Sequence, residues 1–234
     1  MAKFSVVHGQ HHIPAAESSP VTDGPHSGQE PVAGPMTVAP PDGLTTRQRR
    51  LRPALIVNTG AGKGKTTAAM GLALRAWHQG WSIGVFQFVK SGRWASGERI
   101  ALEALGAEHR RIGIGGPVEW FATGTGRSWV RKPDAEPDQA SLAKQAWQQV
   151  KEQLAAQKHR LYVLDEFTYP IKWGWLDVAE VVAVLRDRPG FQHVVVTGRE
   201  APPELVGIAS VVTEMGKTKH VFDSGQKGQP GIEW

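Results

Sequence analysis

The sequence predicts an α/β fold in which helices flank a mainly parallel sheet. Short apolar runs of strand length alternate with segments of helical periodicity along most of the chain. The chain has 234 residues, 40% of them hydrophobic, which is enough for one good core plus a tail. Every apolar run stays well below the roughly 20 residues that span a bilayer, so we expect no membrane segment.

Residues 1–43 differ in composition from the rest of the chain. They are rich in Pro, Gly, Ser and His and lack apolar periodicity. We therefore predict a disordered N-terminal extension, followed by one domain over residues 44–234. The arginines that open this domain are Arg47, Arg49, Arg50 and Arg52. They form either a solvated basic linker or a segment that orders over an anionic ligand.

The domain begins with an apolar run over 54–58, which has the length and composition of a buried parallel strand. A glycine-rich loop follows it and opens a helix over 65–79, which we expect to end at Gly80. The change from an apolar run to a glycine loop and then to helical periodicity indicates a strand–loop–helix unit.

The remaining elements alternate in the same way. Residues 98–105 predict a helix that ends at Gly106, and the glycine-rich residues 113–126 indicate a loop. We expect further strands at 83–89, 160–164, 193–197 and 210–213, and further helices at 139–157, 177–185 and 203–209. Ligands of such sheets bind beyond the carboxyl ends of the strands, so the residues there are the candidate site.

The glycine-rich loop has the composition of a phosphate-binding loop, although its first glycine stands one position closer to Gly-Lys-Thr than usual. Its residues are Gly60, Ala61, Gly62, Lys63, Gly64, Lys65, Thr66 and Thr67. We expect backbone N–H groups and the helix N-terminus to bind phosphate oxygens. Lys65 would neutralise phosphate charge, and the Thr66 hydroxyl would reach Mg²⁺. The alternative is a turn that only joins strand to helix.

Asp165 and Glu166 follow an apolar strand, where a phosphate loop has its magnesium-binding partner. Adjacent side chains of an extended strand point to opposite faces, so we expect only one of the two to meet the metal directly. Arg199 ends another strand and could hold phosphate or ribose, or be a solvated turn residue. Arg75, on the first helix, is either a surface cation or a further phosphate contact.

Composition narrows the chemistry. The absence of cysteine excludes thiolate metal sites and cysteine nucleophiles, and it fits a cytoplasmic location. The net charge of +5 suits either a small anionic ligand or nucleic acid. Most of the nine tryptophans are expected as core or interface anchors, although some could stack on a planar ligand. With no evident nucleophile–base pair, an ATPase, a kinase and an enzyme whose substrate brings the nucleophile all remain open.

The chain resembles the ATP:corrinoid adenosyltransferases that have a RecA-like P-loop fold. The resemblance covers about residues 44–234 and rests on "TGAGKGKTTAAMGLALRA", "FQFVKSGRWASGER", "LYVLDEFTYPIKWGWL", "HVVVTGR" and "KHVFDSGQKGQPGIEW". It implies transfer of the 5′-deoxyadenosyl group of ATP to the Co(I) of a reduced corrinoid, with release of triphosphate. The Co(I) corrinoid is then the nucleophile. The shortened loop implies ATP bound in the reverse sense from ordinary P-loop enzymes.

The resemblance also implies roles for individual residues. Lys65 would hold phosphate, and Thr66 with Glu166 would ligate Mg²⁺ (or Mn²⁺). The cations that would help bind triphosphate or nucleoside are Lys63, Arg75 and Arg199. At position 61 family members often carry an asparagine that touches the ribose, and Ala61 cannot make that contact.

A second departure from the family pattern concerns the corrinoid. Family members carry an aromatic–Thr–Trp element that expels the lower axial ligand of cobalt. The matching stretch here is Arg127-Ser128-Trp129, which keeps the tryptophan but replaces the first aromatic residue. The resemblance therefore implies the role of that element for Trp129 in the first place, and for Arg127 only by its matching position.

The family further implies a homodimer, a flavin-type reductant, and an N-terminal segment that folds over the active site. We expect no nucleic-acid or membrane partner. Two rival functions remain for comparison. A P-loop ATPase or kinase would act at the γ-phosphate, and a RecA-like nucleic-acid module would bind DNA in a salt-sensitive way.

Overall fold

A computed structural model describes residues 43–45, 48, 50, 52–91, 96–124 and 136–232 of the chain. The chain divides into two units, Met1–Leu44 and Thr45–Trp234, and all the helices and strands given below belong to the second. Residues 1–42 and Trp129 lie outside the described residues. The predicted disorder of residues 1–43 and the predicted role of Trp129 therefore both stay predictions.

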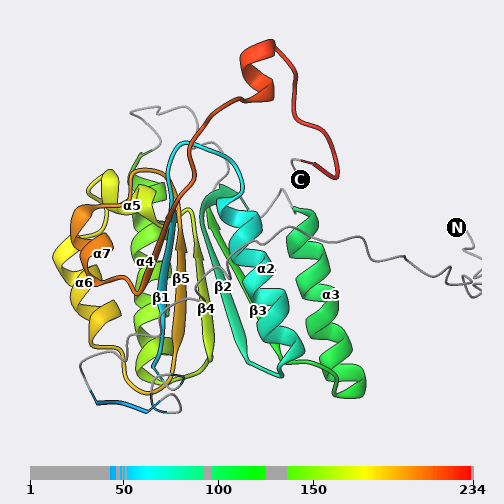
Figure 1. The fold of residues 1–234 in the computed structure, drawn as a ribbon, viewed down its shortest axis with the longest axis vertical. Helices are drawn as coiled ribbons and strands as arrows, with labels where there is room; N and C mark the ends of the chain where they lie inside the picture. Colours follow the sequence, from blue (N-terminus) through cyan, green and yellow to red (C-terminus); the bar gives the residue numbers. More distant parts are fainter. Residues whose placement is uncertain are drawn as a thin grey trace, which may run out of the picture. The chain divides into compact units, whose positions relative to one another are not determined.

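A six-stranded sheet forms the centre of the described part of the molecule (Figure 1). Its strands are β1 (Leu55–Thr59), β2 (Ile83–Ser91), β3 (Val118–Gly124), β4 (Leu161–Asp165), β5 (His193–Thr197) and β6 (Val211–Glu214). They lie in the order β3-β2-β4-β5-β1-β6, and every pair is parallel. The predicted α/β class is confirmed, and the five predicted strands are present with small shifts in their bounds.

Helices cover both faces of the sheet. One face carries α2 (Lys65–His78) and α3 (Gly97–Ile112), and the other carries α4 (Glu136–Ala155), α5 (Thr168–Lys172), α6 (Val178–Arg186) and α7 (Pro203–Ile208) (Figure 1). A short 3₁₀ helix, η2 (Val221–Ser224), follows β6. Within the described ranges, no helix is long and apolar enough to cross a membrane.

The period of two along the strands divides the core into two layers. In β4, Leu161 and Val163 pack with the α2 and α3 side, whereas Tyr162 and Leu164 pack with the other helices. Burial on both faces explains why the central strands β1, β4 and β5 are nearly continuous apolar runs.

Two predictions for the middle of the chain are wrong. Gly106 does not end α3: it is buried inside the helix, and an added Cβ would lie 3.1 Å from Val118 Cβ. Gly106 therefore permits close helix–strand packing, and Gly113, with φ 73°, ends the helix. Residues 113–126 are not simply a loop, because they contain β3. This edge strand has few consecutive apolar residues between glycines, and its pairing with β2 outweighs that weak local signal.

Candidate functional site at the carboxyl ends of the strands

On four adjacent strands, the apolar run ends at a buried polar side chain, and these four side chains form a row. Gln87, Asp165, Thr197 and Asn58 stand at the same register on β2, β4, β5 and β1. None of the four is more than 4% exposed. Each is an even number of positions after a residue that packs with α2 and α3, so all four belong to that face. The row thus lies on the sheet face from which α2 begins.

Asp165 is the centre of this row. Its Oδ1 accepts hydrogen bonds from Thr66 Oγ1 (2.8 Å) and Thr197 Oγ1 (2.7 Å), and its Oδ2 accepts one from Gln87 Nε2 (3.2 Å). Because the Thr66 hydroxyl gives its hydrogen to Asp165, the oxygen lone pairs of Thr66 remain for a cation. The donor set at Thr66 therefore fits a hard metal ion such as Mg²⁺.

Glu166 departs from strand geometry. It has φ 58°, a left-handed conformation that is uncommon for residues other than glycine, and its N–H donates to Thr197 Oγ1 over 3.0 Å. The alternation of faces that applies to an extended strand therefore stops at Asp165. Strand alternation therefore gives no basis for placing Asp165 and Glu166 on opposite faces at this junction, and which of the two meets the metal stays a prediction.

The phosphate loop lies beyond the same ends of the strands (Figure 1). Gly64 caps α2 with φ 104°, and the first turn of α2 holds no acidic residue. A helix N-terminus of this kind attracts anions through its free N–H groups and its dipole. Lys65 Nζ donates to the carbonyl oxygens of Gly60 (2.8 Å) and Gly62. An ammonium group has three N–H donors, so one donor remains to meet a phosphate.

Two charged residues act on Lys65. Burial lowers the pKa of Lys65, the positive charge of Arg199 lowers it further, and the negative charge of Glu166 raises it. Arg199 and Glu166 are therefore close enough to Lys65 for their charges to matter. The structure brings together these three predicted site residues, which lie at the start of α2 and just after β4 and β5.

The segment after β6 supports the shortened loop. Gly62 N–H donates to the Met215 carbonyl oxygen over 2.6 Å. A Cβ added at Gly62 would lie 2.5 Å from the Gly216 oxygen, and one added at Gly60 would lie 2.6 Å from the Met215 oxygen. The glycines at 60 and 62 are thus required by close packing, and the Gly62 N–H is used by the protein rather than offered to phosphate.

The other predicted site residues within the described ranges are exposed to solvent. Ala61, Lys63 and Thr67 are exposed at the loop and the start of α2. Arg75 is exposed in the last turn of α2, about 15 Å along the helix axis from Lys65, so this chain does not bring it to the loop. Trp129 and Arg127 lie outside the described residues.

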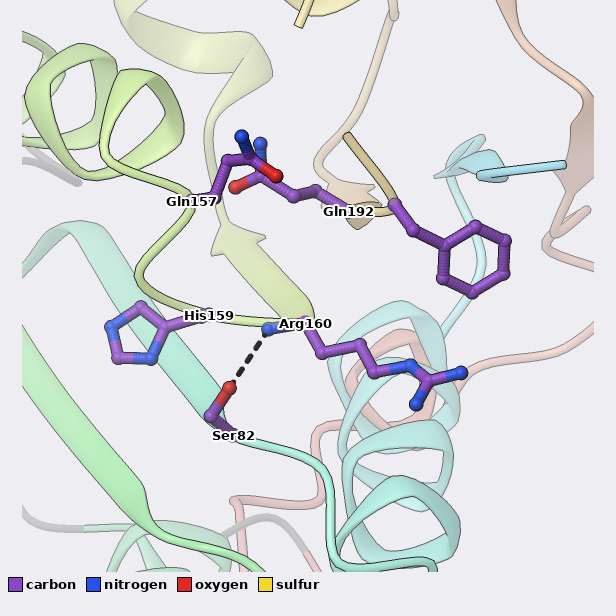
Figure 2. A pocket seen from close by; sticks show the side chains of 6 residues that line it. Ser82, Gln157, His159, Arg160 and Gln192 are labelled. Atoms are coloured by element: carbon purple, nitrogen blue, oxygen red, sulfur yellow. Dashed lines mark hydrogen bonds between the residues drawn. The ribbon is translucent and has the colours of Figure 1, made fainter. Parts of the chain in front are cut away.

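The cavity that Figure 2 shows lies at the opposite ends of the strands, where β2, β4 and β5 begin. It has a volume of about 400 Å³ and is lined by Ser82, Gln157, His159, Arg160, Phe191 and Gln192. These residues directly precede β2, β4 and β5, and the Arg160 N–H donates to Ser82 Oγ over 3.0 Å. The cavity is therefore separate from the phosphate loop, which lies beyond the other ends of the same strands.

Metal binding at the loop would rest on few protein ligands. Across the described ranges, no group of three or more His, Cys, Asp or Glu side chains could hold a metal ion. Mg²⁺ bound to a nucleotide needs only one or two protein oxygens, because phosphates and waters supply the rest. A site of that kind would therefore need no larger cluster of acidic residues than this end of the sheet offers.

The sequence interpretation missed several contributors to the site. Gln87 and Asn58 could have been identified from the sequence, because each is a polar residue at the end of an otherwise apolar strand. Thr168, whose hydroxyl donates to the Arg199 carbonyl oxygen, and the Met215–Gly216 segment carry no such signal. Their roles depend on contacts with residues distant in the chain.

Comparison with known proteins gives consistent matches. Residues 52–234 match the family described as ATP:corrinoid adenosyltransferase BtuR/CobO/CobP. The corrinoid adenosyltransferase of Escherichia coli strain K12 is 40% identical over 183 residues, which are 78% of this chain and 86% of that protein. The corrinoid adenosyltransferase CobA of Salmonella typhimurium is 39% identical over 193 residues, 82% of this chain and 91% of that protein. A corrinoid adenosyltransferase of Pseudomonas aeruginosa is 37% identical over 193 residues, 82% and 89% of the two chains.

Proposed function

Because the chain belongs to the ATP:corrinoid adenosyltransferase family, we propose that it transfers the 5′-deoxyadenosyl group of ATP to a reduced corrinoid. The Co(I) electron pair forms the Co–C5′ bond as the C5′–O bond breaks, and triphosphate leaves with the electrons of that bond. Cobalt is oxidised formally to Co(III). The protein need not supply a nucleophile or a general base, which agrees with the absence of an evident pair of that kind in the sequence.

The observation that best supports this proposal is the arrangement around Lys65. Lys65 is held by two loop carbonyls at the N-terminus of α2, within range of the charges of Arg199 and Glu166. Preorganised positive charge of this kind stabilises a leaving polyphosphate, because the donors are already oriented when negative charge develops. Holding ATP and corrinoid in the reacting geometry supplies the second part of catalysis.

The nucleotide would carry Mg²⁺ (or Mn²⁺), which neutralises charge on the leaving triphosphate. Thr66 and Glu166 would provide the protein oxygens. Asp165 accepts the Thr66 hydrogen over 2.8 Å and so would orient the Thr66 oxygen toward the ion. In this assignment Asp165 acts through Thr66 instead of binding the metal itself.

The test is to mix the protein with ATP, Mg²⁺ and chemically reduced corrinoid, and to identify both products. We expect a light-sensitive Co–C bond in the corrinoid spectrum and triphosphate as the phosphorus product. An ATPase or kinase would give ADP with orthophosphate or a phosphorylated acceptor. Absence of both adenosylcorrinoid and triphosphate would overturn the proposal.

Trp129 provides a separate test of how the corrinoid is activated. We propose that it helps to expel the lower axial ligand of cobalt, which makes Co(II) easier to reduce. Trp129→Ala should therefore reduce activity with oxidised Co(II) corrinoid much more than with chemically reduced Co(I) corrinoid. Equal losses with the two substrates would contradict this role.

The remaining proposals concern the oligomeric state, the location, the reductant and the N-terminal segment of the enzyme. We propose a homodimer that works in the cytoplasm with a flavin-type reductant. Residues 45–52, which include Arg50 and Arg52, would order over the bound nucleotide. Light scattering, reduction assays with candidate flavoproteins, and protease protection by ATP test these proposals separately.

A further inference from the structure

Thr197, the last residue of β5, forms hydrogen bonds with Asp165, which ends β4, and with Glu166, which follows it. Its hydroxyl donates to Asp165 Oδ1 over 2.7 Å and accepts the N–H of Glu166 over 3.0 Å. Thr197 is fully buried. Because Glu166 has an unfavourable left-handed φ of 58°, its backbone needs an interaction of this kind to hold it.

Thr168 makes the reciprocal contact, from the segment after β4 to the segment after β5. It lies at the start of α5, two positions after Glu166, and its hydroxyl donates to the Arg199 carbonyl oxygen over 2.7 Å. Thr168 is also fully buried. A Cβ added at Gly198 would lie 2.0 Å from Thr168 Oγ1, so only glycine allows the two strand ends to approach this closely.

We propose that Thr197 and Thr168 are positioning residues: Thr197 sets Glu166 for the metal and holds Asp165, which orients Thr66, and Thr168 sets Arg199 for the triphosphate. This proposal rests on the proposed function. Thr197 holds the Asp165 carboxylate and the backbone of Glu166, and Thr168 holds the backbone of Arg199, so the segments that carry these charged residues keep a fixed separation. A separation fixed before ATP binds reduces the reorganisation needed in the transition state.

Thr197→Val tests the first half, because valine keeps the shape of threonine but removes the hydroxyl. With chemically reduced corrinoid, we expect kcat to fall about tenfold and the Mg²⁺ concentration for half-maximal rate to rise about fivefold. Thr197→Ser, which keeps the hydroxyl, should stay within about threefold of the wild type in both quantities. A purely structural role would lower the yield of folded protein without shifting the Mg²⁺ dependence.

A second variant keeps the role of Thr197 testable if Thr197→Val folds poorly. Thr197→Cys keeps the size of serine with a much weaker donor and acceptor. It should also need more Mg²⁺ than Thr197→Ser does. Wild-type Mg²⁺ dependence in Thr197→Cys or Thr197→Val would overturn the role of Thr197, and so would equal impairment of Thr197→Ser.

Thr168→Val tests the second half and is a matched control for the first. Loss of the bond to Arg199 should raise the KM for ATP about tenfold while the Mg²⁺ dependence stays within about twofold of the wild type. Thr168→Ser should restore the KM. An unchanged KM for ATP, or a Mg²⁺ shift like that of Thr197→Val, would contradict the assignment.

Failure of this proposal can be told apart from failure of the proposed function. If the wild-type protein forms neither adenosylcorrinoid nor triphosphate, the proposed function is wrong. Calorimetric titration with ATP, with and without Mg²⁺, then decides the positioning roles. Thr197→Val should weaken only the binding that Mg²⁺ promotes, whereas Thr168→Val should weaken ATP binding in both conditions. Unchanged titrations for both variants would overturn the proposal.

Discussion

Thr66 Oγ1 donates a hydrogen bond of 2.8 Å to Asp165 Oδ1, joining the first turn of α2 to the end of β4. This bond connects the phosphate loop to the buried polar row beneath it. Through Asp165, Thr66 is linked to Thr197 on β5 and Gln87 on β2. The hydroxyl proposed to bind Mg²⁺ is therefore fixed by the sheet and not only by its own helix.

Replacing Thr66 with valine should reduce adenosyl transfer strongly. The variant loses the proposed metal ligand and leaves Asp165 Oδ1 without one of its donors. We expect kcat/KM for ATP to fall about 100-fold, since each charge-assisted bond contributes about 1.5–3 kcal/mol. Thr66→Ser is the control and should keep most of the activity. Initial rates at saturating corrinoid measure both, and a valine variant with near wild-type rates would contradict the assignment.

Asp165 and Glu166 should respond differently to loss of charge. Asp165→Asn places an amide among buried donors, so we expect a loss of about 1–3 kcal/mol in the free energy of unfolding. Glu166→Gln, at a partly exposed position, should change that free energy by less than about 0.5 kcal/mol yet reduce the rate of transfer. Urea unfolding together with initial rates gives both quantities. The reverse pattern would show that the structural and metal-binding roles are exchanged.

Gly62 and Gly216 form a matched pair for testing the packing of the loop. Alanine at 62 would place its Cβ 2.5 Å from the Gly216 oxygen and 2.7 Å from the Met215 oxygen. Gly62 has no positive φ, so the expected effect comes from this contact alone. We expect Gly62→Ala to raise the KM for ATP about tenfold. Gly216→Ala meets no atom within 4 Å and should behave as the wild type; similar effects at both positions would refute the packing argument.

His159 should make stability depend on pH. Burial lowers its pKa to about 4 from an ordinary 6.5, while Glu119 raises the pKa and Lys158 lowers it. Between these two values the unfolded chain binds a proton that the folded protein does not, so stability falls as pH drops from 6.5 to about 4. With partial screening by solvent, we expect a loss of about 2 kcal/mol over this range.

His159→Gln provides the comparison for that titration. Its amide can still donate to Gln153 Oε1, which accepts from His159 Nε2 over 2.9 Å, but it does not titrate. The neighbouring Glu119–Lys158 ion pair and Tyr162 remain in both proteins. The difference in unfolding free energy between wild type and variant should therefore shrink as pH falls. A constant difference would contradict the lowered pKa.

The strand ends were visible in the sequence because buried parallel strands are apolar runs that stop at polar residues. That pattern located Asp165, Glu166 and Arg199 correctly at one edge of the sheet. The backbone conformation of Glu166 was not visible, because a left-handed φ at a glutamate depends on the Thr197 contact. The family resemblance already implied Glu166 as the metal ligand, whereas the buried bonds of Asp165 to Thr66, Gln87 and Thr197 needed the structure.

The two glycines of the α3 region also show that a role set by a distant contact cannot be predicted from the local sequence. Gly106 and Gly113 are identical in type, yet only Gly113 ends the helix. Gly106 is set apart by its packing against Val118, a contact that belongs to the fold and not to the local sequence. The contact of Met215 with the phosphate loop was equally hidden, since it joins segments from opposite ends of the domain.

The central claim is that the corrinoid attacks C5′ of ATP and that triphosphate leaves intact. The most direct measurement uses ATP labelled with ¹³C at C5′ and follows the carbon and phosphorus spectra of one reaction. The proposed function predicts that the label becomes bonded to cobalt while triphosphate forms in equal amount. Label that stays bonded to oxygen, with ADP and orthophosphate as the phosphorus products, would contradict it.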